Sequence, residues 1–443
     1  MGDLIKIKKG LDIPLEGKAA DRTETDQLTD LFAICPDDYP GPVWKCVVKE
    51  GDKILVGAPL LIDKLGNEIA LTSPTDGTVQ EIKRGERRHI EYISIKKNSA
   101  TVTKTDLSDI KSKEGIRILL KKTGLWALMR QRPYDIVPEN DSEPRDIFVT
   151  AFDTAPLAGE LLDADLSPWL EKGLETLAKL TDGKVYLNKR AGSPLTSKAA
   201  VVTEFEGPHP AGNVGTQIAA IKPVNKGEVV WTLDAASAAR IGKLMATGET
   251  DYRTHVAVTG PEVENPHYVD TLIGASIESL LHSFTLKDKN LRVISGNVLT
   301  GIKVSKSGFL HFPYRQITVI SEGEDADEFM GWASMNPKKY SVKRTFPAFL
   351  RGLSKPFDFD ARIKGGRRAM ILSGEYDKVF PFDIYPEYLL KSIISGDIDR
   401  MEKLGIYEVA PEDFALPEFV DTSKMELQKI VREGLDKLRK ELS

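Results

Sequence analysis

The sequence predicts a multidomain α/β protein, and three observations support this fold class. Residues 43–100 form a run of short strands separated by Gly-Asp and Asp-Gly turns, which is typical of a compact all-β module. Residues 106–253 then alternate between apolar strands and helices, the pattern of an open α/β sheet. The segment after residue 385 is helical, and 443 residues exceed the usual size of one hydrophobic core.

Composition and charge exclude several classes of protein. Hydrophobic residues make up 41% of the chain and charged residues 29%, which is ordinary for a globular protein. With 61 basic and 66 acidic residues the net charge is −5, so we expect no binding to nucleic acid. Cys35 and Cys46 cannot build a disulfide framework and lack the spacing of a metal site, so we expect two buried thiols and no metal.

The chain shows no sign of export or of membrane insertion. Its first residues, MGDLIKIKKGLDIPLEG, contain lysines but no apolar core of a signal peptide. No window approaches the ~20 apolar residues that a membrane-spanning helix requires. We therefore expect a soluble protein on the cytoplasmic side, without a transmembrane segment, that can still sit on a membrane partner.

The first part, expected over residues 1–105, comprises an N-terminal segment and a β module. The pattern EGDKILVGAPL followed by SPTDGTV resembles the barrel-sandwich module of lipoyl and biotinyl carrier domains. Those carriers place a modified lysine eight residues before the Ser-Pro proline. Counting back from Pro74 reaches Gly66, with Lys64 two residues away, so a carrier function is not supported.

The second part, expected over residues 106–253, reads as a Rossmann-like α/β domain. An amphipathic helix is predicted over 115–133, a buried strand over 145–153 and a second helix over 166–183. The segments KVYLNKR and AAVVTEFEG supply further strands. Strands and helices in this order predict an open sheet.

The remaining two parts follow from the same reading. Residues 254–283 predict strand, turn, strand and helix, an order that resembles the soluble-ligand-binding β-grasp domain, here expected over 254–335. The last part, expected over 336–443, is a helical domain. Its final helix is predicted to open with a capping box formed by Ser423 and Glu426.

One glycine-rich loop, EGPHPAGNVGTQIAAI from Glu206 to Ile221, invites comparison with nucleotide-binding loops. A dinucleotide fingerprint needs G-x-G-x-x-G, whereas Gly212 and Gly215 give only G-x-x-G. The prolines on either side of His209 carry no N–H to offer a pyrophosphate, so we do not expect dinucleotide binding here. Two readings stay open: His209 orients a carbonyl or quinone oxygen, or the loop is a rigid junction between domains.

Longer blocks of sequence resemble one family. The segments GPHPAGNVGTQI, WTLDAASAARIGKLMATGE, GWASMNPKKYSVKRTF and DIYPEYLLKSIISGDIDRMEKLGIYEVAPEDFALPEF are similar to the A subunit of the Na+-translocating NADH:quinone oxidoreductase. The resemblance implies a bacterial inner-membrane complex of six subunits, in which the other five (B to F) are partners and this chain is peripheral on the cytoplasmic side. That complex passes electrons from NADH through flavins and iron–sulfur clusters to ubiquinone and exports Na+.

The same resemblance implies that this chain binds no flavin and no iron–sulfur cluster. Related subunits of respiratory complex I and of the Rnf complex hold the flavin phosphate with a loop like G-G-A-G-F-P-T. The corresponding segment here, KKTGLWALMRQRPYD, keeps only Gly124 and is predicted to be helical. Pro417 and Asp421 stand near the positions of the relatives' cluster cysteines, and no cysteine follows Cys46, although a cluster needs about four thiolates.

Two functions then remain for this chain. It forms or borders the quinone site without a catalytic residue of its own, or it is a structural scaffold that docks on the membrane subunits. A quinone site needs an apolar cleft with a few polar groups aimed at the carbonyls. The candidate residues for such a site, with ubiquinone as the ligand, are His209, Gly212, Gly215, Thr216 and Trp126.

Overall fold

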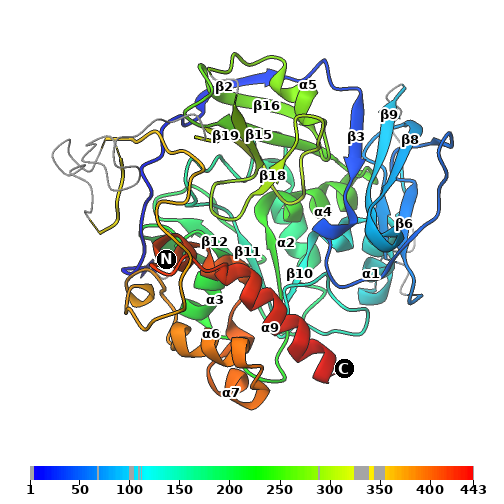
Figure 1. The fold of residues 1–443 in the computed structure, drawn as a ribbon. Coiled ribbons are helices and arrows are strands. Elements are labelled where there is room, and N and C mark those ends of the chain that lie inside the picture. The colour runs from blue at the N-terminus through cyan, green and yellow to red at the C-terminus, as the bar shows by residue number, and fades with distance from the viewer. Residues whose placement is uncertain are drawn as a thin grey trace.

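Four parts are visible in the structure (Figure 1), a computed structural model that describes residues 4–66, 69–98, 104–107, 110, 112–287, 290–323, 339–343 and 355–442. Four β-sheets and a C-terminal group of helices account for the fold, so the expected α/β multidomain class is confirmed. The domain boundary predicted at residues 335–336 lies outside the described residues.

The β module consists of two small sheets that pack face to face. One sheet has the order β3-β9-β8-β5 and the other β4-β6-β7. Their buried side chains, such as Leu60, Leu71 and Ile93, meet in one core. The barrel-sandwich prediction is confirmed. The strands are β3 (Leu31–Ile34), β4 (Trp44–Cys46), β5 (Lys53–Ile54), β6 (Pro59–Asp63), β7 (Ala70–Thr72), β8 (Gly77–Arg84) and β9 (Ile90–Lys97).

The α/β domain is built on a six-stranded sheet with the order β1-β13-β12-β11-β14-β10. All neighbouring strands are parallel except β10, which is antiparallel to β14. The strands are β1 (Leu4–Lys6), β10 (Arg130–Arg132), β11 (Asp146–Thr150), β12 (Val185–Arg190), β13 (Val201–Glu206) and β14 (Val230–Asp234), and the helices are α1 (Lys113–Lys122), α2 (Leu170–Leu177), α3 (Val214–Ile221) and α4 (Ala235–Thr247).

Side chains of β11 alternate between the two faces of this sheet. Ile147 and Val149 pack with α2 and α4, while Phe148 packs against Ile218 of α3 on the opposite face. Both faces are thus covered, which explains why β11 reads as an apolar run.

Strand order reverses at the centre of the sheet. The chain runs from β11 outward to β12 and β13, and then returns through α3 to β14 on the other side of β11. The carboxyl ends of β11 and β14 therefore meet, and Thr150 and Asp234 are direct register partners there. Open α/β sheets bind ligands at such a reversal point.

The single helix predicted over 115–133 is wrong. The helix α1 ends at Lys122 because Gly124 adopts a left-handed conformation with φ of 78°, followed by a 3-10 turn over Leu125–Leu128 and by strand β10. A side chain at Gly124 would also come within 2.6 Å of the Thr72 hydroxyl oxygen. The predicted helix over 166–183 is a 3-10 turn followed by α2, which ends at Leu177.

The third domain contains the fourth sheet, which has the order β18-β17-β19-β15-β16-β2 and lies at the top of Figure 1. Its strands are β2 (Ala20–Thr25), β15 (Arg253–Thr259), β16 (His267–Leu272), β17 (Leu291–Ser295), β18 (Ile302–Val304) and β19 (Gln316–Ser321), with helix α5 (Ile277–Leu281). Strands β1 and β2 both precede the barrel-sandwich module in the chain, yet β1 joins the sheet of the α/β domain and β2 joins the sheet of the third domain.

The C-terminal helices share one apolar core with Tyr376 and Phe380. They are α6 (Pro386–Ser395), α7 (Ile398–Lys403), α8 (Ala415–Val420) and α9 (Leu427–Leu442). The predicted capping box is wrong, because Ser423 donates its hydroxyl proton to the Ala369 carbonyl at 3.1 Å and Glu426 pairs with Arg367. Among the described residues, no helix is long and apolar enough to span a membrane.

Candidate functional site

A cavity of about 200 Å³ lies at the carboxyl ends of the parallel strands. It is lined by the end of β11, by the loop between β13 and α3, and by Asp234 at the end of β14. The third domain closes it with residues that follow β17 and residues at the start of β19, and the C-terminal domain contributes Glu412. The cavity therefore occupies the place where the reversal of strand order predicts a ligand.

His209 is fixed in the wall of this cavity by bonds to its backbone and its ring. Its backbone N–H donates to Asp12 at 2.9 Å, and its carbonyl accepts the N–H of Leu11 at 2.8 Å. The side chain is only 3% exposed. His209 is thus held by the N-terminal segment as well as by its own loop.

Thr154 is the hydrogen-bond partner of this imidazole. Thr154 Oγ1 accepts the N–H of Gly212 at 2.9 Å and lies 3.2 Å from His209 Nδ1. In the tautomer in which the Thr154 hydroxyl donates to Nδ1, the ring proton stands on Nε2. Burial lowers the pKa of His209 to about 4, so the ring is neutral at physiological pH.

The Nε2 atom of His209 has no hydrogen-bond partner within the described part of the chain. A buried polar group without a partner costs free energy, about 1–3 kcal/mol, and native proteins seldom leave one. Here the group belongs to a neutral imidazole whose residue lines the cavity. The arrangement is suited to a ligand that offers an acceptor oxygen.

The structure brings only part of the predicted site together. Gly212 lines the cavity beside His209, and a side chain there would come within 2.6 Å of the Thr154 nitrogen. Gly215 and Thr216 follow on α3 but do not line the cavity. Gly215 packs instead against the carboxylate of Asp413, and Thr216 is 1% exposed, with no partner for its hydroxyl among the residues that the structure describes.

Trp126 lies in the core between the β module and the sheet, away from the residues that line the cavity. Its indole N–H donates to the Pro138 carbonyl at 2.9 Å, and its ring meets Trp231 edge-on at 5.0 Å. The guanidinium of Arg117 sits over both rings. Packing and one satisfied hydrogen bond account for this tryptophan.

Three charged residues near the cavity were not identified from the sequence. Arg132, which is 2% exposed, donates to Asp413 at 2.9 Å and to Glu412 at 2.5 Å. About 280 positions separate Arg132 from these two carboxylates in the chain, so no local pattern signals the cluster.

A second ion pair closes the cavity from the side of the third domain. Arg315 donates to both oxygens of Asp234, at 2.8 and 2.9 Å, and Asp234 also caps α4 by accepting the Ser237 N–H at 2.7 Å. Burial alone would raise the pKa of Asp234, but Arg315 and this N–H hold it below its usual value. The pair fixes the third domain against the end of β14.

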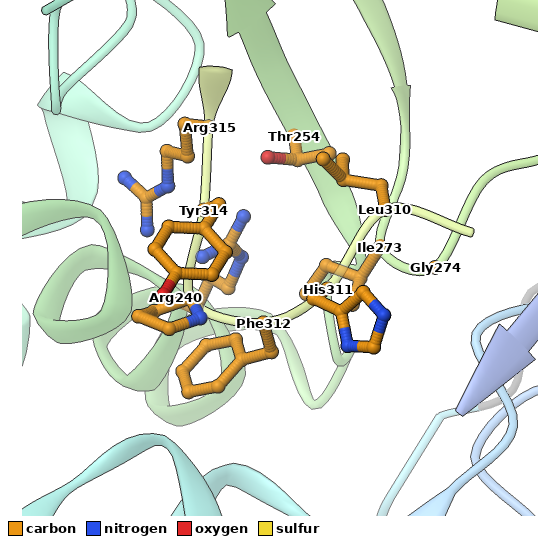
Figure 2. Close-up of a pocket in the computed structure, with 10 residues that line it drawn as sticks. Arg240, Thr254, Ile273, Gly274, Leu310, His311, Phe312, Tyr314 and Arg315 are labelled. Carbon is orange, nitrogen blue, oxygen red and sulfur yellow. The ribbon is translucent and has the colours of Figure 1, made fainter. Parts of the chain in front are cut away.

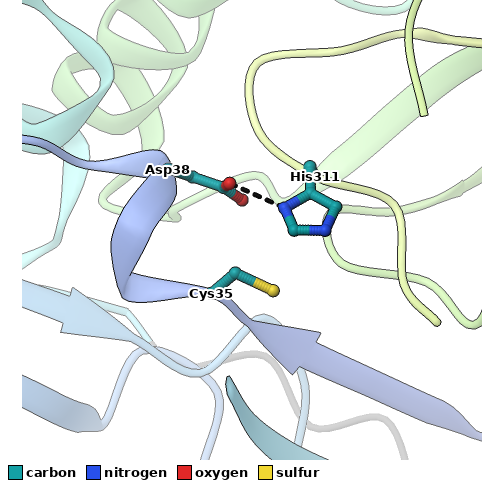
Figure 3. Close-up of side chains that lie close together, drawn as sticks. All are labelled: Cys35, Asp38 and His311. Carbon is teal, nitrogen blue, oxygen red and sulfur yellow. Dashed lines mark hydrogen bonds and ion pairs between the residues drawn. The ribbon is translucent and has the colours of Figure 1, made fainter. Parts of the chain in front are cut away.

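A separate cluster, absent from the sequence prediction, joins Cys35, Asp38 and His311 (Figure 3), whose potential metal-ligand atoms lie within 4.8 Å of one another. Hydrogen bonds already occupy the side chains of Asp38 and His311. His311 Nδ1 and Asp38 Oδ1 lie 2.7 Å apart, and Asp38 also accepts the Phe312 N–H. Burial, followed by repulsion from Asp38, raises the pKa of the Cys35 thiol well above its usual value. This cluster is explained as a polar contact between the β module and the third domain.

A small cavity beside that cluster is lined by Arg240, His311, Phe312 and Tyr314 (Figure 2). Its volume of about 10 Å³ holds at most one water molecule. The Nε and Nη1 atoms of Arg240 have no partner within the described residues. The cavity is too small for an organic ligand.

Three family models match consecutive parts of the chain. They are described as the NqrA N-terminal barrel-sandwich hybrid domain, matching residues 5–98, the NqrA second alpha/beta domain, matching residues 111–250, and the NQRA C-terminal domain, matching residues 255–306. The order of these models agrees with the order of the first three parts of the fold.

Three relatives that match over their full length share the same protein name. The chain is similar to the A subunit of the Na(+)-translocating NADH-quinone reductase of Pasteurella multocida (36% identical, 99% of this chain and 100% of that protein), of Serratia proteamaculans (37%, 99% and 100%) and of Saccharophagus degradans (38%, 99% and 100%). Among solved structures, an NAD+-reducing [NiFe]-hydrogenase in the H2-reduced state aligns with 67% of this chain and 55% of that chain at 12% identity and a TM-score of 0.33. From the full-length similarity to its relatives, the chain belongs to the family of the A subunit of the Na+-translocating NADH-quinone reductase.

Proposed function

We propose that this chain takes part in the quinone-reduction step of the Na+-translocating NADH-quinone reductase, as a peripheral subunit on the cytoplasmic side of the bacterial inner membrane. In this proposal the other five subunits (B to F) are its partners, and it binds the ubiquinone head group without a flavin or iron–sulfur cluster of its own. NADH, flavins, iron–sulfur clusters and Na+ belong to the rest of the complex.

The unpartnered Nε2 of His209, a neutral residue that lines the cavity, is the observation that carries the proposal. A quinone is neutral, and its carbonyl oxygens are acceptors without protons to donate. A neutral imidazole that presents N–H at the wall of a cavity is complementary to such an oxygen. An anionic ligand such as a phosphate would instead favour a cation or several backbone N–H groups.

The size of the cavity supports a single ring over a nucleotide. At about 200 Å³ it is smaller than the ~300–1,000 Å³ typical of pockets for drug-sized ligands. A flavin mononucleotide or a dinucleotide is larger than this cavity, whereas a single substituted ring is small enough to fit in it. The isoprenoid tail of a ubiquinone would extend out of the opening.

The segment in the place of the relatives' flavin loop supports the cofactor-free part of the proposal. Leu125, Trp126, Ala127 and Leu128 form a buried 3-10 turn, so their side chains occupy the space that a phosphate-binding backbone loop would leave open. The chain also has only two cysteines, fewer than one cluster requires. Electrons for a quinone bound here would therefore come from cofactors held by other subunits.

A scaffold role is the alternative, and one observation favours it. The backbone of His209 is bonded on both sides to the N-terminal segment, at Asp12 and Leu11, which is what a rigid junction between parts of the chain requires. In this view the loop holds the domains together and docks the chain on the complex.

Quinone binding by the isolated chain distinguishes the two roles. A short-tailed ubiquinone should bind saturably to the wild-type chain, and His209→Phe, which keeps a ring but removes both nitrogens, should weaken binding about three- to tenfold. That range corresponds to one net hydrogen bond of about 0.5–1.5 kcal/mol. The control is His282→Phe on an exposed residue outside the cavity, with unchanged affinity expected. No saturable binding, or equal affinity in both variants, favours the scaffold.

A further inference from the structure

Strand β2 forms an open edge of the sheet in the third domain. Among the described residues it pairs only with β16, which lies beside it in Figure 1. The Asp26 N–H donates to the Asp270 carbonyl at 2.9 Å, so Glu24, two positions earlier, also directs its backbone groups at β16. The backbone N–H and C=O groups of Thr23 and Thr25 therefore point to the other edge, where no described strand pairs with them.

A cavity of about 560 Å³ adjoins this strand, and six carboxylates line it. We call it the acidic groove. Alternate residues of β2 line the groove, namely Asp21, Thr23 and Thr25, whereas Arg22 and Glu24 between them pair with each other. The charged residues that line the groove are Asp21, Asp26, Glu160, Asp163, Asp165, Asp270, Lys97 and Arg253.

The negative charge of the acidic groove is only partly compensated. Of its two cations, Arg253 is already paired with Asp165 at 2.7 Å. Within the described part of the chain, Asp21, Glu160 and Asp163 form no ion pair. The groove therefore presents unpaired negative charge beside an open strand edge.

The spread of these carboxylates suits an extended chain and not a single ion. Among the described residues, the one set of potential ligand atoms that converges within 4.8 Å is that of Cys35, Asp38 and His311. The carboxylates of the groove do not converge in this way, so they lack the geometry that a metal ion requires. Thr29 is an independent sign of a ligand. It lines the groove, is 7% exposed, and has a hydroxyl oxygen without a partner within the described residues.

We propose that the open edge of β2 and the acidic groove form a docking site for an extended, lysine-rich segment of another subunit of the complex. The segment adds to the sheet as a further strand through main-chain hydrogen bonds with Thr23 and Thr25. Its lysine side chains enter the groove beside Asp21, Glu160 and Asp163. The six residues of β2 span about 20 Å, the length of a common strand. The inference rests on the part of the proposed function that places this chain in a multisubunit complex, and not on the quinone site.

A second copy of this chain does not fit the docking site. Pairing β2 with β2 of another copy brings the carboxylates of both acidic grooves together, and like charges across a strand pair are destabilising. The charges on β2 have one other explanation, which is that they keep the edge from pairing with any strand. That explanation predicts an edge that stays open in the complex.

Hydrogen–deuterium exchange with residue-level mass spectrometry compares the isolated full chain with the assembled complex. In the isolated chain the amides of Glu24 and Asp26, which face β16, should exchange slowly, and those of Thr23 and Thr25 quickly. In the complex the exchange of Thr23 and Thr25 should slow at least about tenfold, while Glu24 and Asp26 stay unchanged.

Two results of this comparison overturn the proposal. One is fast exchange of Thr23 and Thr25 in the complex, because the edge is then open. The other is protection that appears in the isolated chain as its concentration rises, because a second copy then pairs with the edge.

A zero-length carbodiimide cross-linker tests the chemistry of the partner, since it joins a carboxylate to a lysine only where the two are in contact. In the complex, Asp21, Glu160 or Asp163 should become joined to lysines of another subunit, which mass spectrometry of the joined peptides identifies. Protection of the edge without such cross-links shows that the partner segment does not place lysines in the groove, and overturns the proposed chemistry.

A matched pair of variants links the cross-links to the strand edge. Thr23→Pro removes the outward N–H and leaves the bonds to β16 in place, and proline is tolerated at such a position of an edge strand. The cross-link yield should fall about three- to tenfold, the range for one lost hydrogen bond, whereas Thr23→Ala keeps the N–H and should match wild type. Slow exchange of Glu24 and Asp26 in Thr23→Pro shows that the sheet still folds, and equal yields in both variants then overturn the edge pairing.

Quinone binding separates this docking site from the proposed quinone role. Thr23→Pro should bind a short-tailed ubiquinone as the wild type does, because β2 does not line the quinone cavity. Absence of quinone binding in the wild type, together with a protected edge and the expected cross-links, rejects the quinone role and leaves the docking site standing.

Discussion

Replacing His209 by Phe should change how the stability of the protein depends on pH. The pKa of this histidine is lowered from 6.5 to about 4 because the ring is buried. In the unfolded chain the ring takes up a proton below about pH 6.5, whereas the folded chain resists protonation down to about pH 4. Acid therefore favours the unfolded state between these values, and the stability present above about pH 6.5 is lost as the pH falls.

The magnitude follows from the shift. A difference of about 2.5 pKa units corresponds to about 3.4 kcal/mol between the two protonation states, since one unit is about 1.36 kcal/mol. At pH 5 the unfolded ring is almost fully protonated and the folded ring mostly neutral, so about 2 kcal/mol of this difference is expressed. His209→Phe removes the titrating group and with it this part of the acid sensitivity.

Urea denaturation at pH 7.5 and at pH 5 measures the effect. Between the two pH values the wild type should lose about 2 kcal/mol more of its unfolding free energy than His209→Phe does. His282→Phe, an exposed control, should lose as much as the wild type. Equal losses for wild type and His209→Phe would show that the ring is reached by water, and the argument for a neutral donor in the cavity would then fail.

Three further outcomes follow from the structure. Gly215→Ala should lower the unfolding free energy, measured by urea denaturation, by about 2–4 kcal/mol. The new Cβ would lie 2.2 Å from Asp413 Oδ1 and push that carboxylate away from Arg132. An unchanged unfolding free energy would mean that α3 shifts to accommodate the methyl group. A thiol reagent at neutral pH should label Cys46 before Cys35 in the native protein, because Cys35 is buried and its pKa is raised. Mass spectrometry of the labelled chain shows which cysteine reacts first. Early labelling of Cys35 would contradict the packing described. The purified chain should be colourless and free of iron by absorbance and metal analysis, and stoichiometric flavin or iron would refute the cofactor-free proposal.

Features set by short stretches of sequence could be predicted well. Gly-Asp and Asp-Gly turns mark the strands of the barrel-sandwich module, and an apolar run marks β11. The helix predicted over 115–133 failed for a local reason. Its amphipathic pattern continues past Gly124, but this glycine takes a left-handed conformation that ends the helix, and residues 130–132 pair as an edge strand instead.

Features that depend on distant parts of the chain could not be predicted. Strands β1 and β2 look like the start of the first domain, yet each pairs with a strand roughly 200 or more positions away. Parallel pairing of this kind leaves no turn signal in the sequence. The same limit hides the charge cluster, because Glu412 and Asp413 read as an ordinary acidic surface pair until Arg132 is placed against them.

The long-range contacts also determine where the cavity can exist. His209 depends on Asp12 in the N-terminal segment, Asp234 on Arg315 in the third domain, and Arg132 on residues of the C-terminal domain. Each wall of the cavity is thus held by a part of the chain that a single-domain fragment would lack. Because a misplacement of about 1 Å already weakens a positioned hydrogen bond or proton transfer, an α/β fragment made alone should bind quinone more weakly than the full chain, even if its sheet folds.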